Sequence, residues 1–538
     1  MARTSKIYLC KDINVDNEYT NVLNYTVQQM LDLCTSNAHL VASATNYSFI
    51  RETENTISVG FTYSQCLQSN YIVFQNSDYS NKWFFAWIKD VKYVSEASTQ
   101  ITFEVDAWST WFNDLTITNC FVIREHVNSD GYGEHTIPEG LETGEYISQT
   151  SAHFPFGTSH IVMGTLVNPR NGTAWDGGCG EYGGIVSGVK YFIFNNTGSL
   201  NNALERIASA GNSDSIVSLF YCPDWITGYS SATFDSNGIA EVPNTDTATY
   251  GGGISIPLQW TKIGNYTPKN KKLFTYPYCS YIITNNAGGS LELHIEDFHD
   301  NGNHVGQTAV YGTCCPGASI RLIPKYYKAH DRTLSDELNN EYGLTAGKFP
   351  IASYPNDAYT NWMTQNSVNM GIQTIGSLLM IAGGSMAVAT GGASLLPSIL
   401  GGGAITSGAM GIANQMNQVY QHSFNPVHAD GNTNSGDVTY SKGLLSFSGY
   451  FMTIKEEYAK SIDEYFTRFG YKVNRLKTPN ITGRQYWNYV QIGTGEEIGK
   501  GAVPTKYMDI INQATRNGVT IWHNHANIGN YNLNNSIV

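Results

Sequence analysis

The sequence predicts a mainly β fold with a few helices, an α+β arrangement built from β-barrel-type domains. Charged residues make up only 14% of the 538 residues, and polarity comes instead from Asn, Thr, Ser, Gly and 35 Tyr. This mixture favours strands and turns over helices. Many short segments alternate apolar and polar residues and are separated by Asn- and Gly-rich turns, which is typical of barrels and sandwiches.

The region 1–125 is expected to form an N-terminal β-rich domain. Its expected strands, from alternation or apolar runs, are 57–63, 70–75, 82–94 and 100–108. One helix is expected at 25–34, where apolar residues recur near helical spacing. The polar, Gly-punctuated stretch 126–150 is expected to connect this domain to the next one.

The region 151–345 is expected to form a middle β-rich domain, with a short helix at 200–210. Its expected strands are 160–164, 190–194, 215–221, 280–284 and 290–295. A lead-in, 346–365, precedes a long insert at 366–430. The C-terminal part, 431–538, is expected to contain a strong amphipathic helix at 455–470, which Gly470 ends, and strands at 485–490 and 518–523.

The insert differs from the rest of the chain because it carries no formal charge. No Asp, Glu, Lys or Arg occurs between Ala358 and Ala429. The stretches 371–390 and 393–413 are each about as long as the roughly 20 residues that span a hydrocarbon core. Glycines separate them, so together they would form a hairpin. Two interpretations stay open from these residues: a buried Gly/Ala-rich helical hairpin that never meets lipid, or a stored membrane-active segment.

The apolar side chains of the insert are the candidate membrane-inserting or plugging residues. They are Ile372, Ile375, Leu378, Leu379, Met380, Ile381, Met386, Val388, Leu395, Leu396, Ile399, Leu400, Ile405, Met410 and Ile412. His422 and His428 lie at the return edge of the insert and are candidate pH-sensing residues, because an unperturbed imidazole titrates near pH ~6.5. The alternative is that they are two solvated loop histidines.

The bulk charge argues against a protein that grips nucleic acid. The formal net charge is −13, and no Lys/Arg cluster follows a helix or strand face. An acidic chain could still surround DNA without adhering to it, because like charges repel. The nine cysteines have no CxxC spacing, so reduced thiols are expected. The first ten residues contain no apolar signal region, so export by the usual secretory route is not expected.

No enzyme motif stands out, and neither a cofactor nor a metal is predicted. The sequence has no GxSxG, HExxH or Walker loop. The densest His/carboxylate group, at 294–304, could begin a metal site, but its Asn/Gly-rich surroundings favour a solvated loop. His523 and His525 share a face of an extended segment and lack a nearby third ligand.

Several segments resemble one family, in order along most of the chain. They are 82–94, 102–111, 121–127, 135–146, 348–350, 463–475 and 484–489. Together these segments are similar to the distal tail-knob (tail-tip) protein of small, short-tailed bacteriophages of the Salasmaviridae or Picovirinae type. The middle region matches this family only loosely. The resemblance implies a virion protein at the distal tip of the tail, made in the host cytoplasm.

The resemblance further implies a homohexameric tube that conducts genomic double-stranded DNA during ejection, without sequence-specific binding. It implies that 1–125 is the tube domain, that 431–538 completes it, and that 366–430 plugs the lumen and later forms a pore in the host membrane. Other tail proteins, the lower collar or tail tube, are the implied partners. Two rival functions remain: a receptor-binding or wall-degrading tail protein, and a free pore-forming toxin.

Overall fold

The computed structural model describes residues 5–46, 50–75, 80–173, 179–210, 212, 215–299, 304–328, 342–349, 351–352 and 446–538. The chain forms two compact units. The first consists of Met1–Glu145, Thr261–Tyr278 and Ile454–Val538, and the second of Tyr146–Trp260 and Cys279–Thr453. Each unit is therefore built from stretches that are far apart in the sequence.

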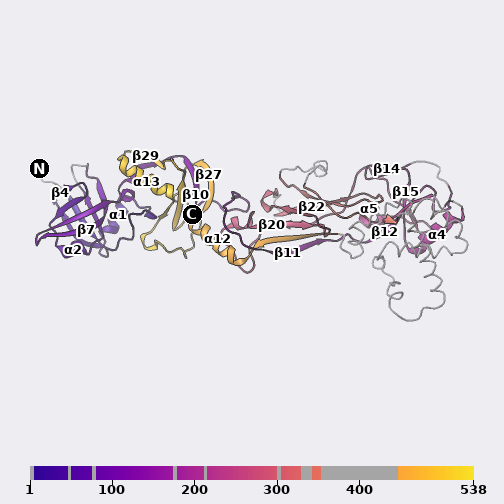
Figure 1. Cartoon of the computed structure of the whole chain (residues 1–538), viewed down its shortest axis with the longest axis horizontal. Helices are drawn as coiled ribbons and strands as arrows, with labels where there is room; N and C mark the ends of the chain where they lie inside the picture. The colour runs from indigo at the N-terminus through magenta and orange to yellow at the C-terminus, as the bar shows by residue number, and fades with distance from the viewer. Residues whose placement is uncertain are drawn as a thin grey trace, which may run out of the picture. The chain divides into compact units, whose positions relative to one another are not determined.

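The first unit contains an antiparallel seven-stranded sheet in the order β3-β1-β6-β7-β8-β5-β4 (Figure 1). Its strands are β1 (Lys6–Cys10), β3 (Leu40–Thr45), β4 (Ile50–Thr53), β5 (Thr56–Val59), β6 (Tyr71–Gln75), β7 (Trp83–Ser95) and β8 (Ser98–Val105). Alternate residues such as Ile7, Leu9, Ile57, Ile72 and Ile101 fill a common core. This sheet confirms the expected β-rich character of the N-terminal region.

The short connection between β3 and β4 requires the seven-stranded sheet to curl. The edge strands β3 and β4 are consecutive in the sequence, and only five Cα steps join Thr45 to Ile50. Five steps reach at most about 19 Å. Seven strands laid flat at about 4.8 Å spacing would place the two edges roughly 29 Å apart. The two edges must therefore approach each other, as in a sheet that closes on itself.

A second sheet of the first unit joins the two ends of the chain. Its order is β2-β30-β28-β10-β27, and β2 runs parallel to β30. The strands are β2 (Asn21–Leu23), β10 (Cys120–Glu125), β27 (Tyr471–Lys477), β28 (Trp487–Ile492) and β30 (Val519–Trp522). A small pair, β9 (Leu115–Ile117) and β29 (Gly499–Gly501), lies beyond it. The helices of the unit are α1 (Val27–Cys34), α2 (Tyr63–Leu67), α3 (Ala107–Trp111), α12 (Glu456–Phe469) and α13 (Thr505–Asn517).

The second unit contains a four-stranded sheet in the order β11-β26-β20-β21 (Figure 1). These strands are β11 (Tyr146–Phe154), β20 (Cys279–Thr284), β21 (Ser290–Leu293) and β26 (Phe447–Ile454). A five-stranded sheet has the order β17-β15-β12-β16-β25, and helix α4 (Thr197–Ser209) packs on it through Leu200, Ala203, Leu204 and Ile207. Its strands are β12 (Ser159–Thr165), β15 (Lys190–Phe194), β16 (Ile216–Pro223), β17 (Ile239–Glu241) and β25 (Ile351–Ala352).

The remaining strands of the second unit form a third sheet and a hairpin. The third sheet contains β18 (Thr249–Tyr250), β19 (Ser255–Pro257), β22 (Val305–Gly312), β23 (Arg321–Lys325) and β24 (Leu344–Thr345). The hairpin is β13 (Gly180–Tyr182) with β14 (Ile185–Ser187). Strands thus dominate both units, which confirms the mainly β prediction.

Two expected strands end earlier than predicted, because a capping residue starts a helix. The strand expected at 57–63 stops at Val59, since Thr62 and Gln65 form a reciprocal capping box that begins α2. The strand expected at 100–108 stops at Val105, since the Asp106 side chain accepts a hydrogen bond from the Ser109 amide and begins α3. Local capping overrides the apolar alternation at both places.

Candidate functional site: an uncharged sheet and a buried ionic junction

The four-stranded sheet of the second unit is almost free of charge. Its strands contain no Lys or Arg and one carboxylate, Glu292. One face is packed: Phe451, Tyr281 and Leu293 lie in one row across β26, β20 and β21, and all three are buried. Next to that row, Tyr450, Ile282 and Glu292 point to the opposite, more exposed face. The sheet therefore presents an open surface of hydroxyl, aliphatic and aromatic groups.

Strand β11 forms one edge of this sheet and lacks the usual protection against pairing. Its nine residues contain no proline and no Lys, Arg, Asp or Glu. In the described part of the chain it pairs only with β26, so its outer edge has no strand partner there. Soluble proteins usually block such an edge with charge, proline or a bulge, because its free backbone groups invite another strand. We call the strands β11, β26, β20 and β21 the uncharged sheet.

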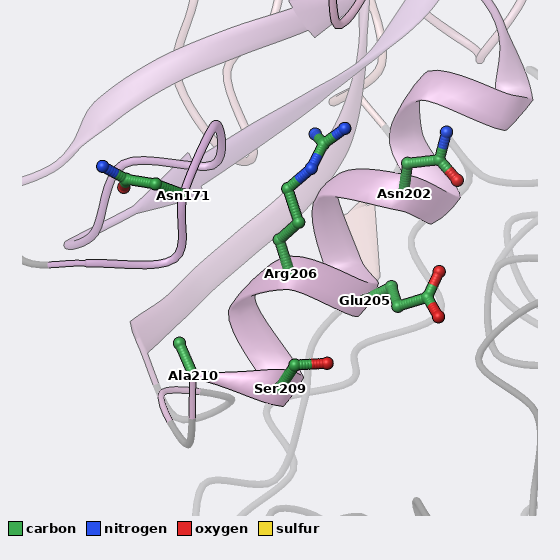
Figure 2. A pocket seen from close by; sticks show the side chains of 6 residues that line it. All are labelled: Asn171, Asn202, Glu205, Arg206, Ser209 and Ala210. Carbon is green, nitrogen blue, oxygen red and sulfur yellow. The ribbon is translucent and has the colours of Figure 1, made fainter.

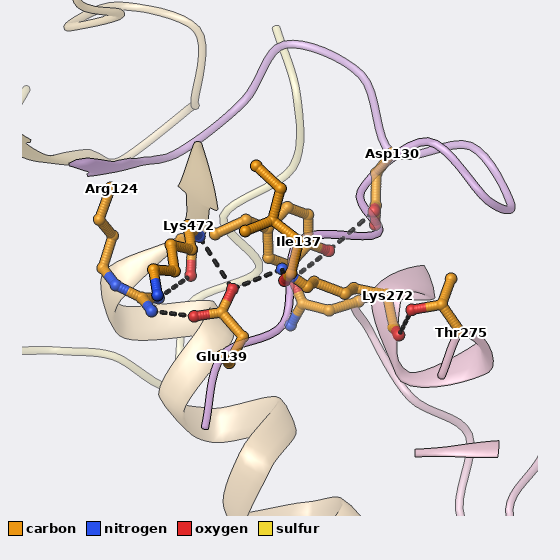
Figure 3. Close-up of polar contacts among 10 residues, drawn as sticks. Arg124, Asp130, Ile137, Glu139, Lys272, Thr275 and Lys472 are labelled. Atoms are coloured by element: carbon orange, nitrogen blue, oxygen red, sulfur yellow. Dashed lines mark hydrogen bonds and ion pairs between the residues drawn. The ribbon is translucent and has the colours of Figure 1, made fainter. Parts of the chain in front are cut away.

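The first unit contains a buried cluster of opposite charges, which we call the ionic junction: Arg124, Glu139 and Lys272 (Figure 3). The side chains are 9%, 0% and 2% exposed, respectively. Glu139 lies between the two cations and also accepts a hydrogen bond from the Lys472 amide at 2.8 Å. Lys272 Nζ donates to the Ile137 carbonyl at 2.8 Å. Every charge in this cluster therefore has an oppositely charged partner.

The ionic junction connects the three stretches that make up the first unit. Arg124 lies in β10 and Glu139 in the segment that follows it. Lys272 lies in the short 3-10 helix η5 (Lys271–Phe274), and Lys472 lies in β27, which follows α12. The pKa of Lys272 is lowered, mainly by burial and to a smaller extent by the positive charges of Arg124 and Lys472, while the Glu139 carboxylate opposes that shift and favours the charged ammonium. The paired carboxylate therefore compensates for part of the desolvation of Lys272.

Two more carboxylates, the buried Asp463 and the half-buried Asp130, strengthen the same connections. Asp463 of α12 accepts hydrogen bonds from the Tyr266 hydroxyl at 2.6 Å and from the Lys269 and Asn270 amides at 2.8 and 3.0 Å. Asp130 accepts from the Tyr471 hydroxyl at 2.7 Å and from the Lys271 amide at 3.1 Å. The chain around 261–278 is thus fixed by side-chain acceptors rather than by a strand ladder.

A buried neutral histidine lies at the end of β10. His126 Nδ1 accepts from the Tyr489 amide at 2.8 Å, so Nε2 carries the proton and donates to the Thr467 carbonyl at 3.1 Å. Burial, with a smaller contribution from the positive charge of Arg484, lowers the pKa of His126 to about 3. This residue is therefore structural and does not titrate near neutral pH.

The candidate plug residues of the insert, Ile372 to Ile412, and the candidate pH sensors His422 and His428 lie outside the described residues. The described chain reaches Ala352 in β25, which pairs with Leu219 of β16. It resumes at Ser446, directly before β26. The insert therefore leads into a central strand of the uncharged sheet. Among the described residues, no helix has the length and apolar character needed to cross a membrane.

The histidines that the sequence singled out for a metal point to separate partners. His294 Nδ1 lies 3.5 Å from Asp297 Oδ2, and Lys328 Nζ lies 3.6 Å from the same oxygen. His304 Nδ1 instead contacts Gln259 Nε2 at 2.9 Å. Within the described ranges no three His, Cys, Asp or Glu side chains converge to hold a metal ion.

His523 and His525 also diverge. His523 Nε2 contacts Asn488 Oδ1 at 3.0 Å, whereas His525 Nδ1 contacts the Tyr25 hydroxyl at 3.1 Å. Burial lowers the pKa of both imidazoles, and for His525 the neighbouring His39 adds to that shift. The two histidine side chains therefore attach the segment 522–525 to Asn488 of β28 and to Tyr25.

One hollow of about 590 Å³ lies along α4 in the second unit (Figure 2). Its lining is polar and includes Asn171, Asn202, Glu205 and Arg206. Figure 2 shows that Arg206 points to one side of the helix while Glu205 and Asn202 point to another. Arg206 Nη2 is bonded to Asn237 Oδ1 at 3.1 Å. These groups do not converge on a common ligand position.

Sequence reasoning missed both features described above. The uncharged sheet combines strands from 146–154, 279–293 and 447–454, and no local pattern indicates that they pair. The ionic junction depends on Lys272, which no sequence pattern singled out. Glu139 lies inside a segment that resembles the tail-knob family, and that match was the only signal available for it.

We expect Glu139→Ala to destabilise the first unit by about 3–5 kcal/mol, because it leaves two buried cations without a carboxylate. Glu139→Gln keeps an acceptor oxygen and should cost less. The control is Glu464→Ala, which removes an exposed pair with Arg468 and should cost under about 0.5 kcal/mol. Denaturant unfolding followed by tryptophan fluorescence measures all three variants. Equal losses for the Ala variants would show that the junction contributes nothing beyond surface charge.

The known proteins that this chain resembles are phage tail proteins. A family model described as the C-terminal domain of tail knob protein gp9 of Bacillus phage phi29 matches residues 241–536, and one described as the N-terminus of the caudoviral major tail protein matches 3–116. Tail knob protein gp9 of phage phi29 is 26% identical over 99% of this chain and 98% of its own length. The corresponding protein of Bacillus phage B103 is 25% identical over 92% of each chain.

A solved structure shares the fold. The tail knob protein gp12 of bacteriophage C1 superposes with a TM-score of 0.63 at 17% sequence identity, covering 99% of this chain and 100% of that one. The family model spans more than half of the chain, so the resemblance read from the sequence is confirmed. The chain therefore belongs to the phage tail knob protein family, whose members are virion proteins at the distal end of the tail.

Proposed function

We propose that the chain is the subunit of a homohexameric tube at the tail tip, which conducts double-stranded genomic DNA during ejection. The observation that carries the proposal is the uncharged sheet with the open edge β11. Its partners are other copies of the chain, the adjacent collar or tube proteins, the passing DNA and the host membrane. Its tail knob relatives are structural proteins, which favours a non-enzymatic role.

The dimensions of a closed wall are compatible with six copies. Six four-stranded sheets give 24 strands, and at about 4.8 Å spacing and 35–45° tilt the backbone radius is about 22–26 Å. Side chains take roughly 5–6 Å of that, which leaves room for a duplex about 20 Å across. Four copies give sixteen strands and only about 15–17 Å of radius, which leaves almost no clearance. A wall of six copies therefore has room for the cargo, and a wall of four copies has almost none.

The chemistry of the open face suits passage rather than binding. DNA-binding surfaces use Lys and Arg to contact phosphates, and this sheet has neither. Glu292 adds a like charge, and so does the net charge of −13. A duplex inside such a wall would meet no cation that holds it at one position.

The insert supplies the second half of the proposal. The segment 366–430, which is uncharged up to Ala429 and carries the apolar residues from Ile372 to Ile412, plugs the lumen and later forms a pore in the host membrane. Six copies related by rotation would bury these side chains against each other in the tube. In lipid they would form helices, which satisfy backbone hydrogen bonds internally. The two rival functions, an adhesin or wall-degrading protein and a free toxin, do not require a ring.

The first test is the mass and shape of the purified chain. We expect native mass spectrometry to give about six times 59.2 kDa, and negative-stain images to show a ring with a blocked centre. Deleting 366–421 should keep the ring and open its centre, and should abolish dye leakage from liposomes. A monomer at every concentration would reject the conduit and leave the toxin or adhesin.

The open edge of β11 gives a sharper test of the ring. We expect Ser148→Lys with Thr150→Lys to abolish ring assembly, because charges on an edge strand oppose pairing with another chain. Val186→Lys is the matched control, since Val186 is 70% exposed in the β13–β14 hairpin of the same unit. Sedimentation should give rings for the control and monomers for the double variant. Intact rings in the double variant would exclude β11 from the subunit contact.

The histidines at the return edge of the insert give a test of triggering. Rings of His422 and His428 would become charged near pH ~6.5 and would repel each other, which favours expulsion of the insert. Replacing both with alanine should flatten the pH dependence of liposome leakage between pH 5 and 8. An unchanged pH dependence of leakage would reject the pH-sensing role of the two histidines.

A further inference from the structure

The turn between β20 and β21 carries two neighbouring asparagines with different tasks. Asn285 closes the turn. Its backbone amide donates to the Gly289 carbonyl at 3.1 Å, and its side-chain Oδ1 accepts from the backbone amides of Ala287 and Gly289 at 3.0 and 2.8 Å. Asn286 adopts a left-handed conformation with φ of 55°. Asparagine tolerates this conformation better than most residues with a side chain.

The side-chain amides of this turn reach two strands that lie on either side of the insert in the sequence. Asn285 Nδ2 donates to the Thr345 carbonyl of β24 at 2.8 Å. Asn286 Nδ2 donates to the Ser446 carbonyl and hydroxyl at 3.3 and 3.0 Å, and lies 3.3 Å from the Ser448 hydroxyl of β26. One turn therefore holds the chain both before and after the stretch 353–445.

These bonds lie in sheltered positions. Asn285 is 9% exposed and Ser446 is 1% exposed, so water does not replace a broken bond without rearrangement. The turn itself does not need the Asn286 amide, because glycine provides a positive φ at no steric cost. The outward-reaching amide is thus a feature beyond what the β20–β21 turn requires.

We propose that Asn285 and Asn286 form a clasp that fixes both flanks of the insert and holds the insert in its stored position until ejection. The proposal rests on the proposed function, since the insert is what the clasp restrains. Asn286 is a positioning residue in this scheme, because it holds Ser446 and Ser448 and contributes no chemistry. Its two contacts to Ser446 and its one contact to Ser448 must be broken before the start of β26 can separate from the turn.

The test uses the full-length protein with Asn286→Gly, which keeps the positive φ, and Asn286→Asp, which keeps the size but replaces the donor with an acceptor. The control is Asn171→Ala, a turn asparagine of the same unit whose side chain accepts only from Thr173, at 3.0 and 2.8 Å. Two measurements are made on each protein. The first is local opening, followed by the hydrogen-exchange rates of β24 and β26 and by the rate of protease cleavage within 353–445. The second is liposome leakage.

We expect both Asn286 variants to show about tenfold faster exchange at the start of β26 and faster cleavage of the insert, since a lost hydrogen bond lowers the local opening free energy. β12 and the Asn171→Ala protein should keep the wild-type rates. Leakage should begin earlier in the Asn286 variants. If exchange and cleavage match the wild type, the clasp proposal is wrong.

The two measurements separate failure of the clasp from failure of the proposed function. Faster cleavage with no leakage from any protein, wild type included, would support the clasp and reject the membrane role of the insert. Leakage from the wild type with unchanged onset in the Asn286 variants would keep the membrane role and reject the restraint by the clasp.

Discussion

The first unit depends on one buried carboxylate between two buried cations. Glu139 binds Arg124 and Lys272 where the three stretches of the unit meet. Strand ladders join the first and third stretches, whereas side-chain contacts hold the middle stretch in the described chain. Such a cluster adds little net stability over an apolar core, but an unmatched member is costly. Displacing any one of the three stretches would leave a buried polar group without its partner. The junction therefore opposes displacement of the stretches more than it adds net stability.

The four-stranded sheet of the second unit, in contrast to the ionic junction, is held together almost without charged side chains. The packed face uses Phe451, Tyr281 and Leu293, and the open face has a single carboxylate. In the proposed tube this surface faces a polyanion, and Lys or Arg side chains of ion pairs there would attract it. Order along the sheet comes instead from backbone ladders and from amides such as Asn286. Backbone ladders thus join distant stretches in both units, together with buried ion pairs in the first unit and side-chain amides in the second.

Local patterns predicted the elements well and their assembly poorly. The 82–94 strand and the 455–470 helix are confirmed as β7 and α12, because an apolar run and a stripe closed by Gly470 are local signals. The early ends of β5 and β8 were missed, since capping by Thr62 and Asp106 competes with alternation at close range. Pairing of β2 with β30 joins residues about 500 positions apart, and no period in the sequence encodes it.

The candidate site was partly predictable for the same reason. The insert can be recognised from composition alone, because the absence of charged residues between Ala358 and Ala429 is a local property of the sequence. The clasp is not, because an asparagine pair before glycines reads as an ordinary turn. Only the fold shows that one amide of that turn contacts Thr345 of β24, on the N-terminal side of the insert, and the other contacts Ser446, on its C-terminal side. In the proposed mechanism the insert leaves a stored position, and this requires fixed ends as well as a suitable composition. The residues that provide those ends therefore lie outside the segment that the sequence makes conspicuous.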